Sequence, residues 1–291
     1  QLAKENKKFI YGLVREGARA QDYETAIMWL SDCGLVHKVS RVNTAGVPLK
    51  AYEDLKAVIN VSRNGKTAYN YEIAMTNMNQ RVYFYLDNVD FWWPNGYGEA
   101  ALYDAEVSLQ NSKGEVFAVD KRKIGIRTII LDRSEDNTEK DGRFCFIVNG
   151  EKIFVRGTNW VPLSVLHSQD ASLVKSTMDM VKDLNCNMIR CWGGNVYEDH
   201  EFFNLCDQYG IMVWQDFAMA CSFYPQNDEF AKKIEEEVRS VVLKLRSHPS
   251  LVLWSGNNEN DESLLWSLAA FRLNPNRDRI SRHVIPQVLY E

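Results

Sequence analysis

The chain has 291 residues, 45% of them hydrophobic and 8 of them Trp, which is enough for two or three domains with sizeable cores. Its 34 basic and 39 acidic residues give a formal net charge of -5, so it offers no basic field for a nucleic-acid backbone. No run approaches the roughly 18 apolar residues of a membrane-spanning helix. The composition therefore predicts a soluble protein that binds neither nucleic acid nor a membrane.

Neither the N-terminus nor the cysteines identify a compartment. Residues 1–8 lack the apolar core of a signal peptide, but the chain begins without Met, so a cytoplasmic or a periplasmic bacterial protein fits equally. The 6 cysteines include no CxxC pair, and we expect buried free thiols rather than disulfides or a metal site. The 5 histidines show no HExxH spacing, so we expect no metal or other cofactor. The oligomeric state stays open.

The first 57 residues form an α-rich segment by their pattern. Residues 22–30 place apolar side chains at helical spacing, and residues 35–42 alternate like a strand. Residues 9–56 resemble a C-terminal segment of bacterial AAA-type ATPases, and this resemblance implies a winged-helix-like element. On that resemblance we interpret residues 1–57 as a segment foreign to the rest of the chain.

Residues 58–135 have an all-β pattern that predicts a small β-sandwich. The sequence Gly65-Lys66-Thr67 is not a phosphate-binding loop, because Asn60 stands where that motif needs Gly, and we expect a hairpin turn at Asn64 and Gly65. Residues 91–98 are rich in aromatics and turn formers, and we expect them to pack against a neighbouring domain rather than to contact a ligand. Alternating runs predict strands over residues 81–86, 105–109 and 116–119.

Residues 140–291 alternate between strand-like and helical patterns after a hairpin turn at Asn149 and Gly150. Helices are expected over residues 171–184, 199–209 and 228–247. Four apolar runs that end in polar residues surround them, over residues 153–160, 187–194, 211–217 and 251–261. This order is typical of a parallel α/β fold, and strand ends rich in Trp and charge, without a glycine-rich phosphate loop, favour a barrel over a dinucleotide-binding fold.

The carboxyl ends of these four strands predict one shared site, because a (β/α)8 barrel builds its active site there. Such a site would be aromatic, acidic and rich in hydrogen-bonding groups, which suits a sugar. Cleavage of a glycosidic bond needs two carboxyl groups. The residues gathered in this way are Asn159, Trp160, Arg190, Trp192, Trp214, Asp216, Asn258 and Glu259.

Seven ordered motifs between about residues 60 and 262 resemble glycoside hydrolase family 2, most closely its β-mannosidases. They cover residues 92–98, 125–128, 146–150, 156–162, 190–194, 214–217 and 254–259. The resemblance implies an immunoglobulin-like β-sandwich followed by a (β/α)8 TIM barrel. It further implies a retaining, exo-acting hydrolase of terminal β-mannosyl residues.

The same resemblance implies roles for individual residues. Glu259 would be the general acid/base, and Asn258 would hydrogen-bond the sugar near its 2-hydroxyl. Arg190 would steady the carboxylates, while Trp192 and Trp214 would shape the pocket. Core packing explains Trp160 and Trp214 equally well, and Asp216 equally fits a carboxylate that only orients its neighbours. The acidic residues Glu198, Asp199, Asp261 and Glu262 are interpreted as helix-start charges.

The chain also departs from the family pattern. A family member needs a second Glu as nucleophile on a late barrel strand, and only about 140 residues follow residue 153, against roughly 200 or more for a whole barrel. We therefore expect a fragment or chimera with half a barrel, without turnover by itself and prone to self-association through its open strand edges. A carbohydrate-binding fragment without catalysis, another family 2 activity such as β-galactosidase or β-glucuronidase, and an ATPase-associated segment remain alternatives.

Overall fold

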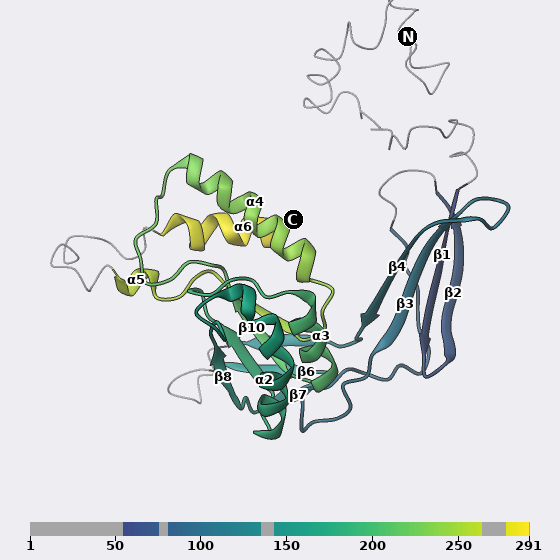
Figure 1. Cartoon of the computed structure of the whole chain (residues 1–291), viewed down its shortest axis with the longest axis horizontal. Helices are drawn as coiled ribbons and strands as arrows, with labels where there is room; N and C mark the ends of the chain where they lie inside the picture. Colours follow the sequence, from purple (N-terminus) through teal and green to yellow (C-terminus); the bar gives the residue numbers. More distant parts are fainter. Residues whose placement is uncertain (1–54, 76–80, 135–142, 264–277, 291) are drawn as a thin grey trace, which may run out of the picture. The chain divides into compact units, whose positions relative to one another are not determined.

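The computed structural model describes residues 55–75, 81–134, 143–263 and 278–290 (Figure 1). The chain divides into two units, and the second of them, residues 57–73 with 83–291, contains nearly all of the described residues. Of residues 1–57, the structure describes only 55–57. The predicted helix and strand and the segment that resembles an ATPase therefore lie outside the described residues, apart from these last positions. Of those three, Lys56 and Ala57 already belong to the first strand.

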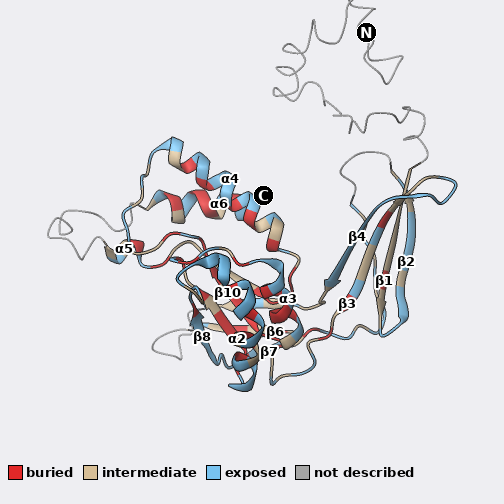
Figure 2. Ribbon diagram, viewed as in Figure 1, coloured by how far each residue is buried: buried red, intermediate tan, exposed pale blue. Residues whose placement is uncertain are grey.

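The all-β region contains one sheet with the strand order β2-β1-β3-β4. Its strands are β1 (Lys56–Arg63), β2 (Lys66–Ala74), β3 (Tyr103–Gln110) and β4 (Val116–Ile124). Asn64 and Gly65 join β1 to β2 with φ angles of 51° and 74°, the left-handed pair of a two-residue hairpin turn, which confirms that prediction. Most of the sheet is exposed or half-buried (Figure 2), and the described residues show one layer of the predicted sandwich.

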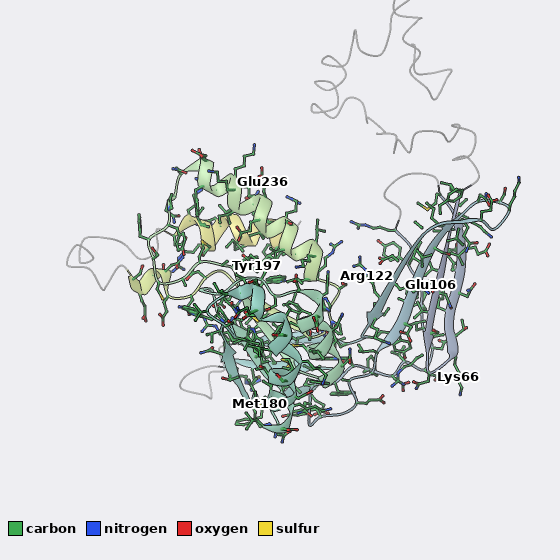
Figure 3. All side chains as sticks on the ribbon, in the orientation of Figure 1. Lys66, Glu106, Arg122, Met180, Tyr197 and Glu236 are labelled. Atoms are coloured by element: carbon green, nitrogen blue, oxygen red, sulfur yellow. The ribbon has the colours of Figure 1, made fainter. Side chains whose placement is uncertain are left out.

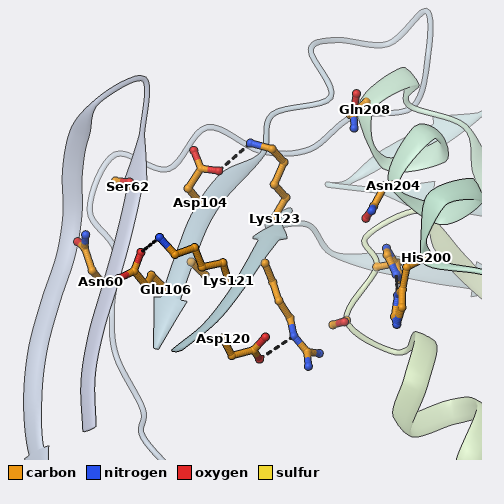
Figure 4. A pocket seen from close by; sticks show the side chains of 14 residues that line it. Asn60, Ser62, Asp104, Glu106, Asp120, Lys121, Lys123, His200, Asn204 and Gln208 are labelled. Atoms are coloured by element: carbon orange, nitrogen blue, oxygen red, sulfur yellow. Dashed lines mark hydrogen bonds and ion pairs between the residues drawn. The ribbon is translucent and has the colours of Figure 1, made fainter. Parts of the chain in front are cut away.

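Opposite charges face each other across β3 and β4. Glu106, labelled in Figure 3, pairs with Lys121 at 2.7 Å, and Asp104 pairs with Lys123 at 2.7 Å (Figure 4). Both pairs are directly opposite in the antiparallel register. Exposed cross-strand pairs of this kind contribute roughly 0.2–1 kcal/mol each, so they favour the register without deciding the fold.

The strand predicted over residues 81–86 is not assigned as a strand in the structure. Its side chains do alternate between exposed and half-buried positions, and Tyr83 and Tyr85 are among the exposed ones. On the half-buried side, the Phe84 ring stacks on Tyr69 of β2 with 4.4 Å between ring centroids. The alternation therefore indicates an extended segment with a ring packed against the sheet. Alternation alone does not show that a segment forms the hydrogen bonds of a strand.

A second sheet precedes the α/β region and has the order β5-β6-β7. Its strands are β5 (Ile129–Asp132), β6 (Cys145–Val148) and β7 (Glu151–Ile153). Asn149 and Gly150, with φ angles of 50° and 89°, form the predicted hairpin turn. Phe146, Val148 and Ile153 of this hairpin pack with Met188 and Met212, which begin two strands of the α/β region.

Four parallel strands in the order β11-β10-β9-β8 form the α/β region, as the sequence predicts for the first half of a barrel. They are β8 (Gly157–Trp160), β9 (Met188–Cys191), β10 (Met212–Asp216) and β11 (Leu251–Ser255). A short 3-10 turn, η4 (His167–Gln169), precedes the first of the three connecting helices. These helices are α2 (Ala171–Asp183), α3 (His200–Tyr209) and α4 (Asp228–Leu245).

Sequence signals explain where these helices begin and end. The Asn227 side chain caps α4 by accepting a hydrogen bond from the Phe230 N–H, and α3 ends at Gly210, whose φ of 70° is the left-handed conformation of a helix stop. In α4 the buried side chains recur every three or four residues, so one stripe faces the interior (Figure 2). Within the described residues, no helix is both long and apolar enough to span a membrane.

The chain continues after β11 into α5 (Asn260–Ser263), and further on into η7 (Ile280–Val284) and α6 (Ile285–Tyr290). The last two helices place their buried side chains in one core cluster with Ile234 and Val238 of α4. The described residues 278–290 are therefore integrated into the α/β region.

The aromatic segment 91–98 packs against the α/β region, as expected. Trp92 is fully buried, and its indole N–H donates to the carbonyl oxygen of Asp207 at 2.8 Å. The Asn95 side chain donates to the carbonyl oxygen of Cys186 at 3.0 Å. These contacts attach the segment to the α/β region through a buried ring and a side-chain amide.

Candidate active site

The parallel strands sort their side chains onto two faces. Met188 and Met212 pack with the β6–β7 hairpin, whereas Ile189 and Val213, the next residues along each strand, join the cluster formed with α2 and α3. Successive strand side chains point to opposite faces, so every second residue returns to the side of Met188 and Met212. In a (β/α)8 barrel this side is the interior, and the other side lies under the helices.

Arg190 and Asp216 lie on the interior face and form the centre of the site. The Arg190 guanidinium donates to both carboxylate oxygens of Asp216, at 2.6 and 3.3 Å. Asp216 also accepts from the backbone N–H of Gly193 at 3.1 Å and from the indole N–H of Trp214 at 2.9 Å. Burial raises the pKa of the Asp216 carboxyl, while the bonds from Arg190 and Trp214 act in the opposite direction. Four donors therefore surround a carboxylate whose side chain is fully covered.

The same guanidinium fixes Asn258, the residue immediately before Glu259. Arg190 Nη2 donates to Asn258 Oδ1 at 2.8 Å, and Asn258 is only 5% exposed. The Asn258 backbone N–H donates to the carbonyl oxygen of Met219 at 2.9 Å. The side-chain amide has two N–H groups, of which one donates to the Cys221 sulfur at 3.3 Å. Within the described part of the chain, that is the one acceptor recorded for this amide nitrogen.

Glu259 stands at the end of β11, directly before α5, and is exposed. Its φ of 55° lies in the left-handed region, which a residue with a side chain adopts only when its surroundings enforce it. Carboxylate oxygen Oε2 accepts a hydrogen bond from the Cys221 thiol at 3.4 Å. The structure thus holds an accessible carboxyl next to the rigid Arg190–Asp216–Asn258 network, which suits proton transfer to a bound molecule.

Trp192 and Trp214 are half-buried at this end of the strands. A Cβ at Gly194 would lie 2.1 Å from the Trp192 ring, and a Cβ at Gly193 would lie 2.4 Å from the carbonyl oxygen of Met219, so only glycine fits at both positions. The Arg190 guanidinium carbon lies 5.3 Å from the centre of the Trp214 ring, within the range of a cation–π interaction. Gly194 therefore allows the Trp192 ring to lie close to the backbone, and Gly193 allows the same for the loop that contains Met219.

Trp160 lies on the other face of the sheet. It is 3% exposed, belongs to the core cluster with α2 and α3, and donates its indole N–H to Glu198 at 2.9 Å. Asn159 is exposed and stands in register with Arg190, on the interior side. The structure therefore brings seven of the eight candidate residues to one end of the strands and places Trp160 in the core.

The four acidic residues interpreted as helix-start charges divide in the structure. Asp199 directly precedes α3, and Asp261 and Glu262 lie in the first turn of α5, as expected. For Glu198 the interpretation is wrong: its side chain is 4% exposed and accepts the Trp160 hydrogen bond. Burial raises the pKa of the Glu198 carboxyl.

Cys221 is a site residue that the sequence does not reveal, because it lies in a loop after a strand and bonds to both Asn258 and Glu259. Tyr197, labelled in Figure 3, joins the loop after β10 to α4 instead: its hydroxyl accepts from the Ala218 N–H at 2.9 Å and donates to Glu237 at 2.7 Å. The described cysteines are free thiols, of which Cys186, Cys191 and Cys206 are buried, while Cys145 and Cys221 are half-buried. Among the described residues, no group of three or more His, Cys, Asp or Glu side chains could hold a metal ion.

Two family models match consecutive parts of the chain. The model described as "Glycosyl hydrolases family 2" matches residues 41–127, and the model described as "Glycosyl hydrolases family 2, TIM barrel domain" matches residues 140–272. The first match begins within the segment interpreted as foreign, and the second contains all eight candidate residues. The resemblance of residues 9–56 to an ATPase has no counterpart in these matches.

The chain is also similar to curated β-mannosidases and to a solved one. It is 39% identical to the β-mannosidase of Capra hircus over 178 residues, which is 61% of this chain and 20% of that protein. It is 36% identical to β-mannosidase B of Aspergillus flavus over 246 residues, 84% of this chain and 28% of that protein. The crystal structure of the β-D-mannosidase from Dictyoglomus thermophilum aligns with a TM-score of 0.72 and 33% identity, covering 83% of this chain and 30% of that one. The chain thus spans less than a third of the length of these relatives.

Proposed function

Because the chain belongs to glycosyl hydrolase family 2, as its two matched domains indicate, we propose that it provides the acid/base side of a β-mannosidase-like active site. The reaction is the hydrolysis of terminal β-mannosyl residues with retention of configuration. The observation that carries the proposal is the placement of Glu259: an exposed carboxyl that follows an asparagine held by Arg190 and Asp216 at the end of a parallel strand.

In this proposal Glu259 first protonates the departing glycosidic oxygen and then takes a proton from the attacking water. Asn258 offers an N–H of its side-chain amide to a sugar hydroxyl, which fits a contact near the 2-hydroxyl that strengthens in the transition state. Arg190 and Asp216 fix the orientation of Asn258. Trp192 and Trp214 provide apolar ring faces for the C–H surface of the sugar.

A retaining glycosidase also needs a carboxylate nucleophile about 5–5.5 Å from the acid/base. Asp216 does not fit that role, because its carboxylate is fully covered and occupied by Arg190, Trp214 and the Gly193 N–H. We therefore assign no nucleophile within the described residues. The proposal for Glu259 does not depend on where that second carboxylate lies.

The test compares Glu259→Gln with Glu262→Gln in the product of the complete reading frame that contains these residues. Glu262 is an exposed glutamate in α5 and serves as the matched control. Loss of a general acid lowers the rate about 10²–10⁴-fold, so we expect that loss for phenyl β-mannoside hydrolysis in Glu259→Gln and wild-type rates in the control.

The same assay separates the alternative functions. Faster wild-type hydrolysis of an aryl β-galactoside or β-glucuronide than of the β-mannoside would assign another family 2 activity. Binding of a mannoside without hydrolysis by the wild-type protein would indicate a carbohydrate-binding role. Equal rates in wild type and Glu259→Gln would refute the assignment of Glu259.

A further inference from the structure

The loop after β10 is joined to the segment that carries Asn258 and Glu259. The Asn258 N–H donates to the carbonyl oxygen of Met219 at 2.9 Å, and the Cys221 N–H donates to the carbonyl oxygen of Asn258 at 2.8 Å. Ala220 and Asn258 form an isolated parallel bridge. These backbone bonds hold Cys221 beside Glu259, although the two residues lie 38 positions apart in the sequence.

Both Cys221 and Glu259 adopt left-handed backbone conformations, with φ angles of 49° and 55°. Such conformations are unfavourable for residues with a side chain by about 1 kcal/mol or more and persist only where surrounding contacts enforce them. The other described residues with a side chain and a positive φ are all asparagines, which tolerate this conformation. The side chains of Cys221 and Glu259 meet, with 3.4 Å between the sulfur and Glu259 Oε2, so backbone strain lies on both sides of this contact.

The hydrogen-bonding groups fix the direction of each bond. The Asn258 amide nitrogen can only donate, so the sulfur accepts from it, and the one proton of the thiol is then donated to Oε2 of Glu259, an oxygen that can accept whether or not the other carboxyl oxygen carries a proton. Burial and the neighbouring Glu259 raise the pKa of the Cys221 thiol, while the Asn258 bond lowers it. The neutral S–H form is therefore favoured, which suits a hydrogen-bond donor and not a nucleophilic thiolate.

We propose that Cys221 is a positioning residue for Glu259: its thiol holds the carboxylate in place while Asn258 holds the sulfur. The inference rests on the proposed role of Glu259. Cys221 does not touch the sugar in this account, and it acts on proton transfer only through the orientation of the carboxyl group. Substrates that need little protonation of the leaving group should therefore depend little on Cys221.

The first test measures kcat/KM for phenyl and dinitrophenyl β-mannosides in the product of the complete reading frame. We expect Cys221→Ala to lower kcat/KM about tenfold for the phenyl substrate, a part of the general-acid contribution, and less than about threefold for the dinitrophenyl substrate. Cys221→Ser keeps a hydroxyl donor and should restore most of the lost rate. Cys145→Ala, which removes the other half-buried thiol, is the control and should leave both rates unchanged.

An equal loss on both substrates, no loss in Cys221→Ala, or no rescue by Cys221→Ser would each overturn the proposal. If Glu259→Gln is fully active, the proposed function fails instead. A second measurement does not need turnover: the rate at which iodoacetamide alkylates Cys221, followed by mass spectrometry of the intact folded chain. Glu259→Gln removes the carboxyl group that raises the pKa of the Cys221 thiol and should speed alkylation several-fold relative to Glu262→Gln, and an unchanged rate would show that the thiol and the carboxyl group are not coupled.

Discussion

The two faces of the same parallel strands differ in what their side chains do. On the interior face, Arg190, Trp214 and Asp216 bond to one another and reach Asn258 through a shared guanidinium. On the helix-covered face, Trp160 fills a core cluster and bonds to one buried carboxylate. All four of these strand residues look alike in the sequence, since each is polar or aromatic near the end of an apolar run. Membership of the site is therefore decided by the face and not by the residue type.

The largest effect should come from breaking the interior network at its centre. Arg190→Met leaves the Asp216 carboxylate buried without its cation, and removing one partner of a buried pair destabilises a protein by about 3–5 kcal/mol. Urea denaturation near neutral pH measures this loss. The double variant Arg190→Met with Asp216→Asn should be more stable than Arg190→Met alone. If the losses of unfolding free energy of the two single variants simply added in the double variant, Arg190 and Asp216 would not be coupled.

A smaller effect should distinguish the two tryptophans. Trp160→Phe leaves the Glu198 carboxylate without its indole donor and should reduce stability by about 1–3 kcal/mol while kcat stays unchanged. Trp214→Phe should lower kcat/KM for aryl β-mannosides, because the donor to Asp216 lies beside the site. Denaturation midpoints and kcat/KM are measured for both variants. If both variants changed the same one of these two quantities, the division into two faces would be contradicted.

The smallest effect concerns the buried carboxylate on the helix-covered face. Burial raises the pKa of Glu198, so the folded protein bears an energetic penalty for the ionised form that disappears at a pH below the unfolded value of about 4.3. Glu198→Gln keeps an oxygen for Trp160 and removes that charge. We expect the variant to be more stable than wild type near neutral pH, by up to about 1 kcal/mol on the scale of one buried hydrogen bond.

The stability advantage of Glu198→Gln should shrink as the pH falls and should vanish well below about 4.3, where the Glu198 carboxyl is protonated in both the folded and the unfolded state. Thermal melting at several pH values measures the difference, with Glu262→Gln as the exposed control. If the difference in melting temperature between Glu198→Gln and wild type did not change with pH, the charge of Glu198 would have no effect on stability.

Much of the architecture follows from local signals in the sequence. Both Asn-Gly hairpins, the three connecting helices and the order of the four parallel strands agree with the predictions, because turn residues, caps and periodicity act over a few positions. The strand predicted over residues 81–86 is wrong, since alternation reports burial and not the hydrogen bonds that define a ladder.

The face of Trp160 could not be read from the sequence. The sequence predicts one strand with a polar end over residues 153–160, but β7 ends at Ile153 and β8 begins only at Gly157, with Phe154 76% exposed between them. Because the strand is interrupted, counting alternate residues from Ile153 does not tell on which face of the sheet Trp160 lies. Cys221 was missed because its side chain bonds to Asn258 and Glu259, which lie 37 and 38 positions away and are brought close by backbone pairing with Asn258.

The most direct test of the central claim is the stereochemistry of azide rescue in Glu259→Ala. A retaining enzyme without its acid/base still forms the glycosyl-enzyme from dinitrophenyl β-mannoside, and azide then attacks the anomeric carbon in place of activated water. We predict that azide restores the rate in Glu259→Ala and that the product is β-mannosyl azide. An α-mannosyl azide would make Glu259 the nucleophile, and a wild-type rate without azide would show that Glu259 takes no part in catalysis.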